Sequence, residues 1–140
     1  MIKVEFGGKV YAIIIKNDYS KNGIEFFTPD NYSQQLAYMR HPAGKSIDAH
    51  VHNIVKREVE YTQEVLVIRK GHLRVDFYDD TRDYLKSVLV EQGDIILLAH
   101  GAHGFKCLDD VEMIEVKQGP YLKDDDKIRF ESIADSEVRY

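Results

Sequence analysis

The sequence predicts a single all-β domain spanning residues 1–140, and three observations support this fold class. Short runs of alternating or β-branched residues recur along the chain with turn residues between them. No stretch of comparable length shows helical periodicity, and the periodicity of the C-terminal tail is poor. A length of 140 residues with 44% hydrophobic content fits one globular core. Many short strands at this spacing are typical of a β-sandwich or β-barrel.

The chain is expected to begin with a β-hairpin between Val4 and Ile15. The turn of this hairpin is Gly7-Gly8, because glycine readily adopts the positive φ angles of a two-residue turn. A second turn follows between Asn17 and Gly23. The further expected strands are Ile24–Thr28, Gln34–Arg40, Ile47–Asn53, Glu64–Lys70, Leu73–Tyr78, Leu85–Glu91, Asp94–Leu98, Gly104–Leu108 and Val111–Gln118.

Local pattern also predicts the environment of several segments. Leu73, Val75 and Phe77 alternate with more polar neighbours, which predicts a strand with one buried face. Cys107 is expected to be a small buried hydrophobic residue of its strand. The charge run 123–127 is expected to form a solvent-exposed turn.

Charge and composition exclude several classes of protein. Nineteen basic residues against 24 acidic residues give a net charge of −5, which argues against general nucleic-acid binding and against an anionic membrane surface. Cys107 is the single cysteine, so no intramolecular disulfide is expected. The N-terminus alternates and carries charge, unlike a signal peptide, and no apolar run approaches membrane-spanning length. We therefore expect a soluble cytoplasmic protein.

Four residues form a candidate metal site: His50, His52, Glu64 and His103. Because successive side chains of a strand alternate between its faces, His50 and His52 are expected to project from the same face of one strand. Imidazole and carboxylate donors suit zinc, iron, manganese, nickel or copper, so a divalent transition metal is the expected cofactor. The alternative is that these histidines serve structure or catalysis without a metal.

Glycines at fixed distances from these residues resemble the two sequence motifs of the cupin superfamily. Gly44, His50, His52, Glu64 and Gly71 match the first motif, which runs glycine, five residues, His-x-His, a short gap, glutamate, six residues and glycine. The gap between the second histidine and the glutamate is longer here than in the usual motif.

The second motif is matched less closely, by Gly93 and Gly101 followed by His103. Ala99 stands in the proline position, the histidine comes one residue early, and Cys107 replaces the usual asparagine. The resemblance covers roughly residues 34–118. It implies a double-stranded β-helix, or jelly roll, with its core in that range.

The resemblance also implies a reaction class. The phrases at residues 55–58 and 114–121 are similar to those of small cupins from bacterial surface-polysaccharide pathways, which implies a sugar or sugar nucleotide as the substrate and proton transfer by an isomerase or epimerase. Some such cupins work without metal, and His50 and His52 would then be proton carriers. Two alternatives are a non-haem metal dioxygenase and a small-molecule binding or sensing module, because fold alone does not decide function.

The segment 53–63 joins two of the expected ligand strands and supplies further candidates. Lys56 and Arg57 are candidates for binding an anionic group of the substrate, such as a phosphate. The alternative is a solvated loop in which Glu58 and Glu60 balance the basic pair. Tyr61, close to the acidic ligand, is a candidate proton donor.

The sequence also offers two candidate substrate-binding residues and a candidate dimer contact. Tyr38 and Arg40 alternate on the strand before the first motif and are candidates for binding substrate. Residues 13–15 are three consecutive isoleucines, and as an exposed apolar edge they would favour a homodimer. The alternative is an edge strand that covers the barrel of its own chain.

Overall fold

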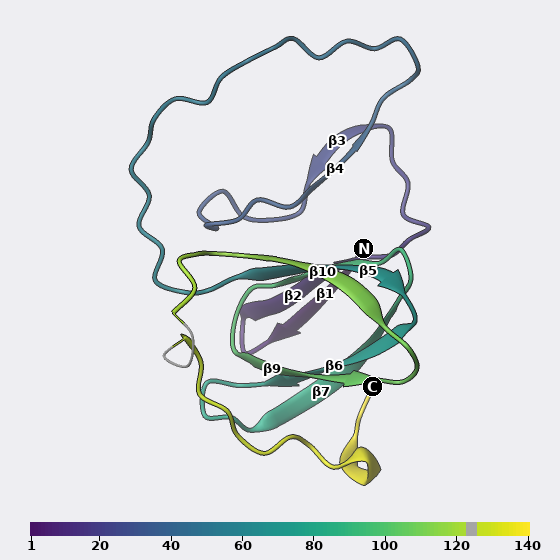
Figure 1. Cartoon of the computed structure of the whole chain (residues 1–140), viewed down its shortest axis with the longest axis vertical. Coiled ribbons are helices and arrows are strands. Elements are labelled where there is room, and N and C mark those ends of the chain that lie inside the picture. Colours follow the sequence, from purple (N-terminus) through teal and green to yellow (C-terminus); the bar gives the residue numbers. More distant parts are fainter. Residues whose placement is uncertain (123–125) are drawn as a thin grey trace. The chain divides into compact units, whose positions relative to one another are not determined.

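The computed structural model describes residues 1–122 and 126–140, and its fold is all-β, as the sequence predicts (Figure 1). The chain divides into two compact units, one formed by residues 1–17 and 62–140 and the other by residues 18–61. In the described residues no helix is long and apolar enough to cross a membrane. The predicted charge run 123–127 lies largely outside the described residues.

The larger unit contains two antiparallel sheets. The first is five-stranded, in the order β1-β2-β8-β5-β10, and the second is three-stranded, in the order β7-β6-β9. The bounds of these strands are β1 (Ile2–Phe6), β2 (Lys9–Ile15), β5 (Glu64–Lys70), β6 (His72–Tyr78), β7 (Tyr84–Glu91), β8 (Ile95–Leu98), β9 (Ala102–Cys107) and β10 (Glu112–Lys117). Each agrees with an expected strand to within about two residues.

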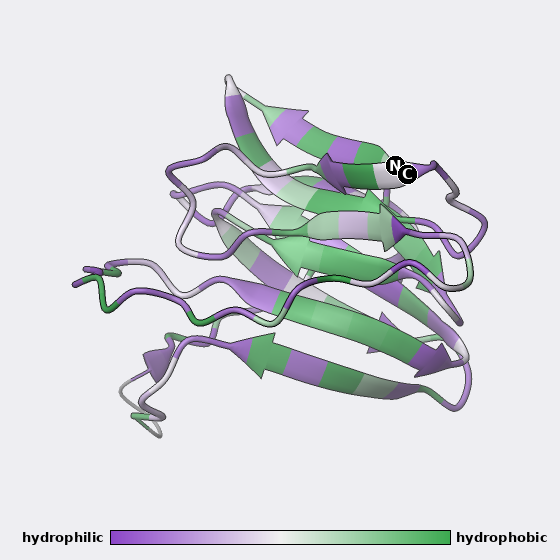
Figure 2. Cartoon of the chain, turned by 90° about the horizontal axis from the view of Figure 1, so that it is seen from above, coloured by the Kyte–Doolittle hydropathy of each residue, from purple (hydrophilic) through white to green (hydrophobic). Residues whose placement is uncertain are grey.

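One hydrophobic core joins the two sheets. Buried side chains of the five-stranded sheet, such as Ile14, Leu66 and Ile96, belong to the same cluster as Leu73 and Phe77 of the three-stranded sheet. Figure 2 shows apolar residues concentrated in the strands and polar residues concentrated in the connecting loops. The burial of these side chains is the main stabilising contribution to the unit.

The predicted N-terminal hairpin is confirmed, but the prediction that its residues 13–15 form an exposed sheet edge is not. Gly7 and Gly8 connect β1 to β2 with φ angles of 57° and 77°, as a two-residue hairpin turn requires. Strand β2 lies between β1 and β8, and residues 13–15 are buried. The expectation that these isoleucines form an exposed edge is therefore wrong, because both edges of β2 are already paired.

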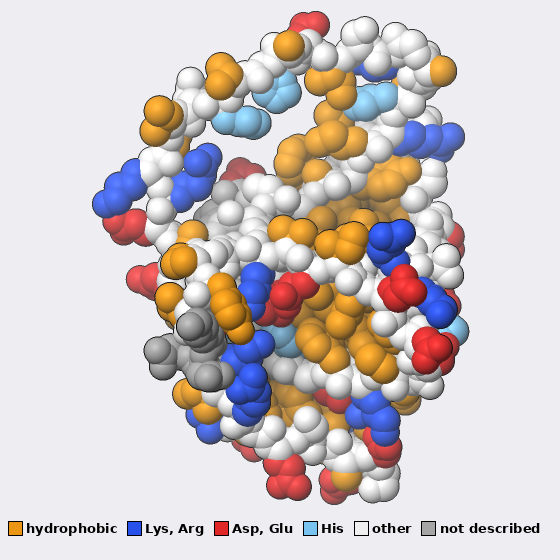
Figure 3. All heavy atoms as spheres, in the orientation of Figure 1, with side chains coloured by type: hydrophobic (Ala, Val, Ile, Leu, Met, Phe, Trp, Pro, Cys, Tyr) orange, Lys and Arg blue, Asp and Glu red, His pale blue; other side chains and the backbone are white. Residues whose placement is uncertain are grey.

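The opposite edge of the five-stranded sheet is β10, which exposes apolar side chains. Ile114 and Val116 are each about half exposed. Hydrophobic side chains reach the surface around this strand in Figure 3, where Lys and Arg side chains are interspersed with Asp and Glu. Cys107, at the end of β9, is exposed, so the expectation of a buried cysteine is wrong.

Strand β6 is buried on both faces, which contradicts the prediction of a single buried face. Arg74 donates hydrogen bonds of 2.8 and 3.0 Å to Asp76, and Ser87 donates one of 2.5 Å to the same carboxylate. The C-terminal segment reaches this polar face, since Arg74 also donates to Asp135 at 2.9 Å. Polar and apolar residues do alternate along β6, but the hydrogen-bonding groups of its polar face are paired within the protein and not with water.

The C-terminal segment is attached to the three-stranded sheet at further points. The hydroxyl of Tyr78 accepts a hydrogen bond of 2.9 Å from the backbone N–H of Ile133, and the Ser87 N–H donates to the carbonyl of Arg139 at 2.7 Å. A single 3-10 turn, η2 (Asp135–Glu137), lies between these attachments. The weak periodicity of this segment reflects an irregular backbone that is held by side chains.

The smaller unit is built on one hairpin, β3 (Gly23–Phe26) paired with β4 (Ala37–Arg40). The Tyr19 ring packs edge-to-face against Phe27 and Tyr38 at centroid distances of 5.4 and 5.2 Å. No strand forms at Ile47–Asn53, so the expected strand carrying His50 and His52 is absent. Its hydrophobic residues are exposed, and an extended segment without a partner strand has no ladder of hydrogen bonds to stabilise it.

Candidate functional site

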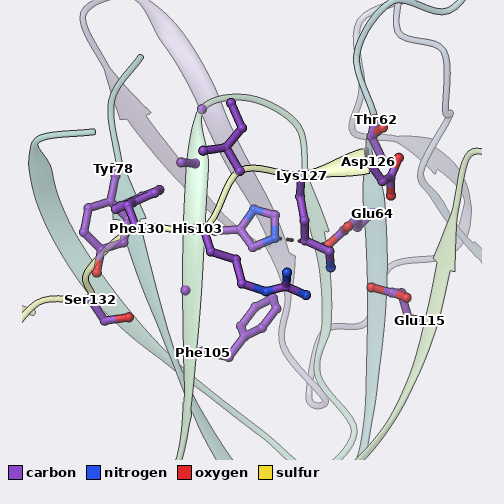
Figure 4. A pocket seen from close by; sticks show the side chains of 15 residues that line it. Thr62, Glu64, Tyr78, His103, Phe105, Glu115, Asp126, Lys127, Phe130 and Ser132 are labelled. Atoms are coloured by element: carbon purple, nitrogen blue, oxygen red, sulfur yellow. Dashed lines mark hydrogen bonds and ion pairs between the residues drawn. The ribbon is translucent and has the colours of Figure 1, made fainter. Parts of the chain in front are cut away.

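Glu64 and His103 meet between the two sheets of the larger unit. Glu64 is the first residue of β5, in the five-stranded sheet, and His103 is the second residue of β9, in the three-stranded sheet. The imidazole Nε2 donates to the Glu64 Oε2 at 3.1 Å (Figure 4). The Glu64 side chain is 12% exposed and the His103 side chain is 26% exposed, so the pair is shielded but still reached by solvent.

Strand alternation explains why these two polar side chains point inward. Glu64 lies on the same face of β5 as Leu66 and Ile68, which are buried in the core. His103 is directly opposite Phe77, another core residue, in the β6–β9 ladder. Both residues therefore occupy inward-facing positions near the starts of their strands, next to hydrophobic core residues.

Gly101 allows β9 to begin where it does. This residue has a φ of +68°, and a Cβ atom there would lie 2.3 Å from the Tyr11 ring. Any side chain would thus collide with the core and strain the backbone. The glycine that the second motif supplies serves to place His103 two residues later.

Lys117 connects this pair to the rest of the site. It pairs directly with Glu64 in the β5–β10 ladder, and its Nζ lies 4.0 Å from the Glu64 Oε1. The same ammonium group contacts the Asp126 carboxylate at 3.3 Å. The pKa of Lys117 is raised, first by the hydrogen bond to Asp126, with further contributions from the charges of Glu115 and Glu64.

The pKa of Glu64 is lowered from its usual value of 4.5. The hydrogen bond from His103 is the largest cause, and the charges of His103, Lys117 and Lys127 act in the same direction. Burial of the carboxyl group acts in the opposite direction and only partly offsets them. Glu64 is therefore held as a carboxylate at neutral pH.

The pair lines a cavity of about 480 Å³, a size suited to a small organic molecule. Residues of β9 and β10 form part of the wall, and the C-terminal segment 126–132 forms another part. Figure 4 shows His103 between Glu64 and the aromatic rings of Tyr78 and Phe130. The lining thus combines charged side chains, hydroxyl groups and aromatic surface.

The other two predicted metal ligands belong to the smaller unit. His50 and His52 are exposed, and their rings lie edge-to-face with centroids 5.2 Å apart. The His50 Nδ1 is 3.0 Å from the carbonyl oxygen of Asp48. No three His, Cys, Asp or Glu side chains form a metal-binding group among residues 1–122 and 126–140. The structure thus pairs Glu64 with His103 and His50 with His52, and the four-ligand site stays a prediction.

The remaining predicted residues also lie in the smaller unit. Tyr38 packs on Tyr19, and Arg40 donates a hydrogen bond of 2.8 Å to the Ser20 hydroxyl. Lys56 forms an ion pair of 2.7 Å with Glu58, as the solvated-loop alternative predicts. Arg57 donates a hydrogen bond of 3.3 Å to the Val55 carbonyl, and Tyr61 is exposed. Their roles in binding or catalysis stay predictions.

Several residues of the cavity have no counterpart in the sequence prediction. Glu115 lines the cavity from β10, and Lys127 and Arg129 line it from the C-terminal segment. The sequence does contain a pattern that links Glu115 to Lys117, because charged residues two apart in a strand share a face. No local pattern links residues 126–132 to a site formed by strands.

A stability measurement tests the Glu64–His103 contact. Because the folded-state pKa of Glu64 is lowered, its carboxylate stabilises the fold above about pH 4.5, and this contribution is lost as the pH falls through the folded pKa. Glu64→Gln should cost about 1–2 kcal/mol of unfolding free energy at pH 7, and the cost should shrink in acid. Urea unfolding at several pH values measures it, with Glu112→Gln on the exposed part of β10 as the control. A cost that does not change with pH would contradict the contact.

Comparisons with protein-family models, with curated proteins and with solved structures found no match for this chain. The case for a function therefore depends on the geometry of the cavity and on the chemistry of the residues that line it.

Proposed function

We propose that this chain is a cupin enzyme that isomerises or epimerises a sugar or sugar nucleotide by proton transfer, in surface-polysaccharide biosynthesis. The observation that carries the proposal is the hydrogen bond between Glu64 and His103 inside a cavity of ligand size. Two antiparallel sheets around one core support the jelly roll that the motifs imply.

The pair has the chemistry of an oriented acid–base catalyst. A neutral imidazole that donates its Nε2–H to Glu64 carries the basic lone pair on Nδ1. Such a base removes a proton from the carbon next to a substrate carbonyl and returns it to a neighbouring carbon or to the opposite face, so that atoms balance without a co-substrate. The Glu64 carboxylate fixes the tautomer and stabilises the imidazolium that forms during transfer.

The lining of the cavity supports a polyhydroxylated substrate. Hydroxyl groups of Thr62 and Ser132 supply hydrogen-bond donors and acceptors, and the rings of Phe105 and Phe130 supply apolar surface. A few polar groups among hydrophobic walls are the usual composition of a small-molecule site. This combination suits a sugar, which has both hydroxyl groups and apolar C–H faces.

The proposed metal would be a divalent transition ion, held by Glu64 and His103 together with His50 and His52. Glu64 and His103 supply two donors with the right chemistry, but no group of three donors forms among the described residues. We therefore assign no catalytic step to a metal. If His50, His52 and Tyr61 approach the same substrate, they would act as additional proton carriers.

The proposed cytoplasmic enzyme would act as a homodimer. Strand β10 is a better candidate for the dimer contact than residues 13–15, because it is an edge strand that exposes Ile114 and Val116. Pairing through β10 would bury this apolar surface in an interface. Light scattering would contradict the dimer by giving a mass near the 16.2 kDa of one chain.

The reaction itself tests the acid–base assignment. The parent protein is incubated in deuterated water with a nucleotide-linked keto-sugar, and mass spectrometry measures deuterium incorporation into carbon. His103→Gln should lower the exchange rate at least about 100-fold, since general acid–base catalysis contributes that much or more. His72→Gln is the matched control, because His72 is exposed on β6 and forms an ion pair with Asp109 outside the cavity. Exchange that survives in His103→Gln at the parent rate would refute the assignment.

Metal content tests the proposed ion. Elemental analysis of protein purified without chelator should find about one divalent transition metal per chain, and His50→Ala or His103→Ala should lower that content. Protein that stays metal-free after incubation with zinc, iron, manganese and nickel would rule out the site. It would also retire the dioxygenase alternative, which requires a bound metal.

A further inference from the structure

Two cationic side chains of the C-terminal segment, Lys127 and Arg129, line the same cavity as Glu64 and His103. Figure 4 shows Lys127 beside the Glu64–His103 pair. Both side chains line this one cavity, so a single ligand can contact both cations. Ile128, which lies between them, also lines the cavity and is mostly exposed.

The cavity wall carries two cations besides the groups that hold Asp126 and Glu64. The Asp126 carboxylate is held by Lys117, and the Glu64 carboxylate is held by His103. The other charged residues of the wall are Glu115, which is negative, and Lys127 and Arg129, which are positive, while Glu64 keeps its own negative charge. Arg129 already interacts with another protein group, but a guanidinium has five donors and can bind a ligand as well.

The backbone that carries the two cations is fixed to the sheet on its C-terminal side. The Phe130 ring packs edge-to-face on Tyr78 at a centroid distance of 5.0 Å. The backbone N–H of Ile133 donates to the Tyr78 hydroxyl at 2.9 Å, and Asp135 accepts a hydrogen bond from the buried Arg74. The cations are thus presented by an anchored wall, which reduces the entropy lost on binding.

We infer that Lys127 and Arg129 bind a phosphoryl group of the substrate while His103 acts on the carbon skeleton. The inference rests on the proposed function, narrows its substrate from any sugar to a phosphorylated one, and assigns the residues that bind the phosphoryl group. A carboxylate is satisfied by one guanidinium fork, whereas a phosphoryl group carries up to two charges and three acceptor oxygens. An ammonium point charge beside a guanidinium fork matches that demand.

This assignment differs from the sequence prediction, which named Lys56 and Arg57 as candidates for binding the anionic group. Lys56 is paired with Glu58, and Arg57 is bonded to the carbonyl of Val55 in the smaller unit. Lys127 and Arg129, in contrast, line a cavity that also holds an acid–base pair. A substrate bound there would have its anionic group and its reacting carbon in one site.

Binding of inorganic phosphate and of pyrophosphate, each measured by isothermal titration calorimetry on the full chain at fixed ionic strength, tests the inference. Separate titrations distinguish a monoester-like site from a diphosphate site. Lys127→Gln and Arg129→Gln should each weaken binding of the tighter probe at least about tenfold. Arg69→Gln, which removes an exposed cation of β5 outside the cavity, should change it less than about twofold. Circular dichroism confirms that each variant is folded.

The outcomes separate this inference from the proposed reaction. Equal affinity in the parent, Lys127→Gln and Arg129→Gln proteins would overturn the phosphoryl site, even if His103→Gln abolishes proton exchange. Failure of the parent to bind either probe at millimolar concentration would overturn it as well. Selective loss of binding in the two variants, with affinity retained in His103→Gln, would support the phosphoryl site even if no proton exchange is found.

Discussion

The hydrogen bond between Glu64 and His103 is the interaction on which the rest of the site depends. It joins the first residue of β5 to β9 and so links the two sheets where their inward-facing positions change from hydrophobic to polar. A shielded carboxylate is costly unless a donor and a positive charge compensate it. His103 supplies the donor and Lys117 the charge, so β5, β9 and β10 each contribute a residue to this set of contacts.

The C-terminal segment completes the wall of the cavity in which this pair lies. It covers the polar side of β6 through the Arg74–Asp135 contact, and its residues 126–132 line the cavity from outside the two sheets. Removing one partner of a buried pair such as Arg74 and Asp76 typically costs several kcal/mol, because the other charge is left without compensation. Through Asp135 the C-terminal segment contacts the Arg74–Asp76 pair of the three-stranded sheet, and through residues 126–132 it lines the cavity.

Local information predicted most of the strands but only part of the site. The strand Glu64–Lys70 and the N-terminal hairpin are confirmed, because hydrophobic pattern and turn glycines define them within a few residues. The strand Ile47–Asn53 is absent, since pairing with another strand decides strand formation and no local pattern encodes it. Glu64 and His103 were predicted together from their motifs, whereas Lys127 and Arg129 reach the cavity only through tertiary contacts.

The tautomer of His103 tests the central claim most directly. Long-range proton–nitrogen correlation spectra of histidine-labelled protein identify which ring nitrogen carries the proton in the neutral imidazole. We predict that His103 is protonated at Nε2, facing Glu64, and that Glu64→Gln changes this spectrum while leaving that of His72 unchanged. A His103 spectrum that is identical in the parent and in Glu64→Gln would show that the two side chains do not interact, and would contradict the account.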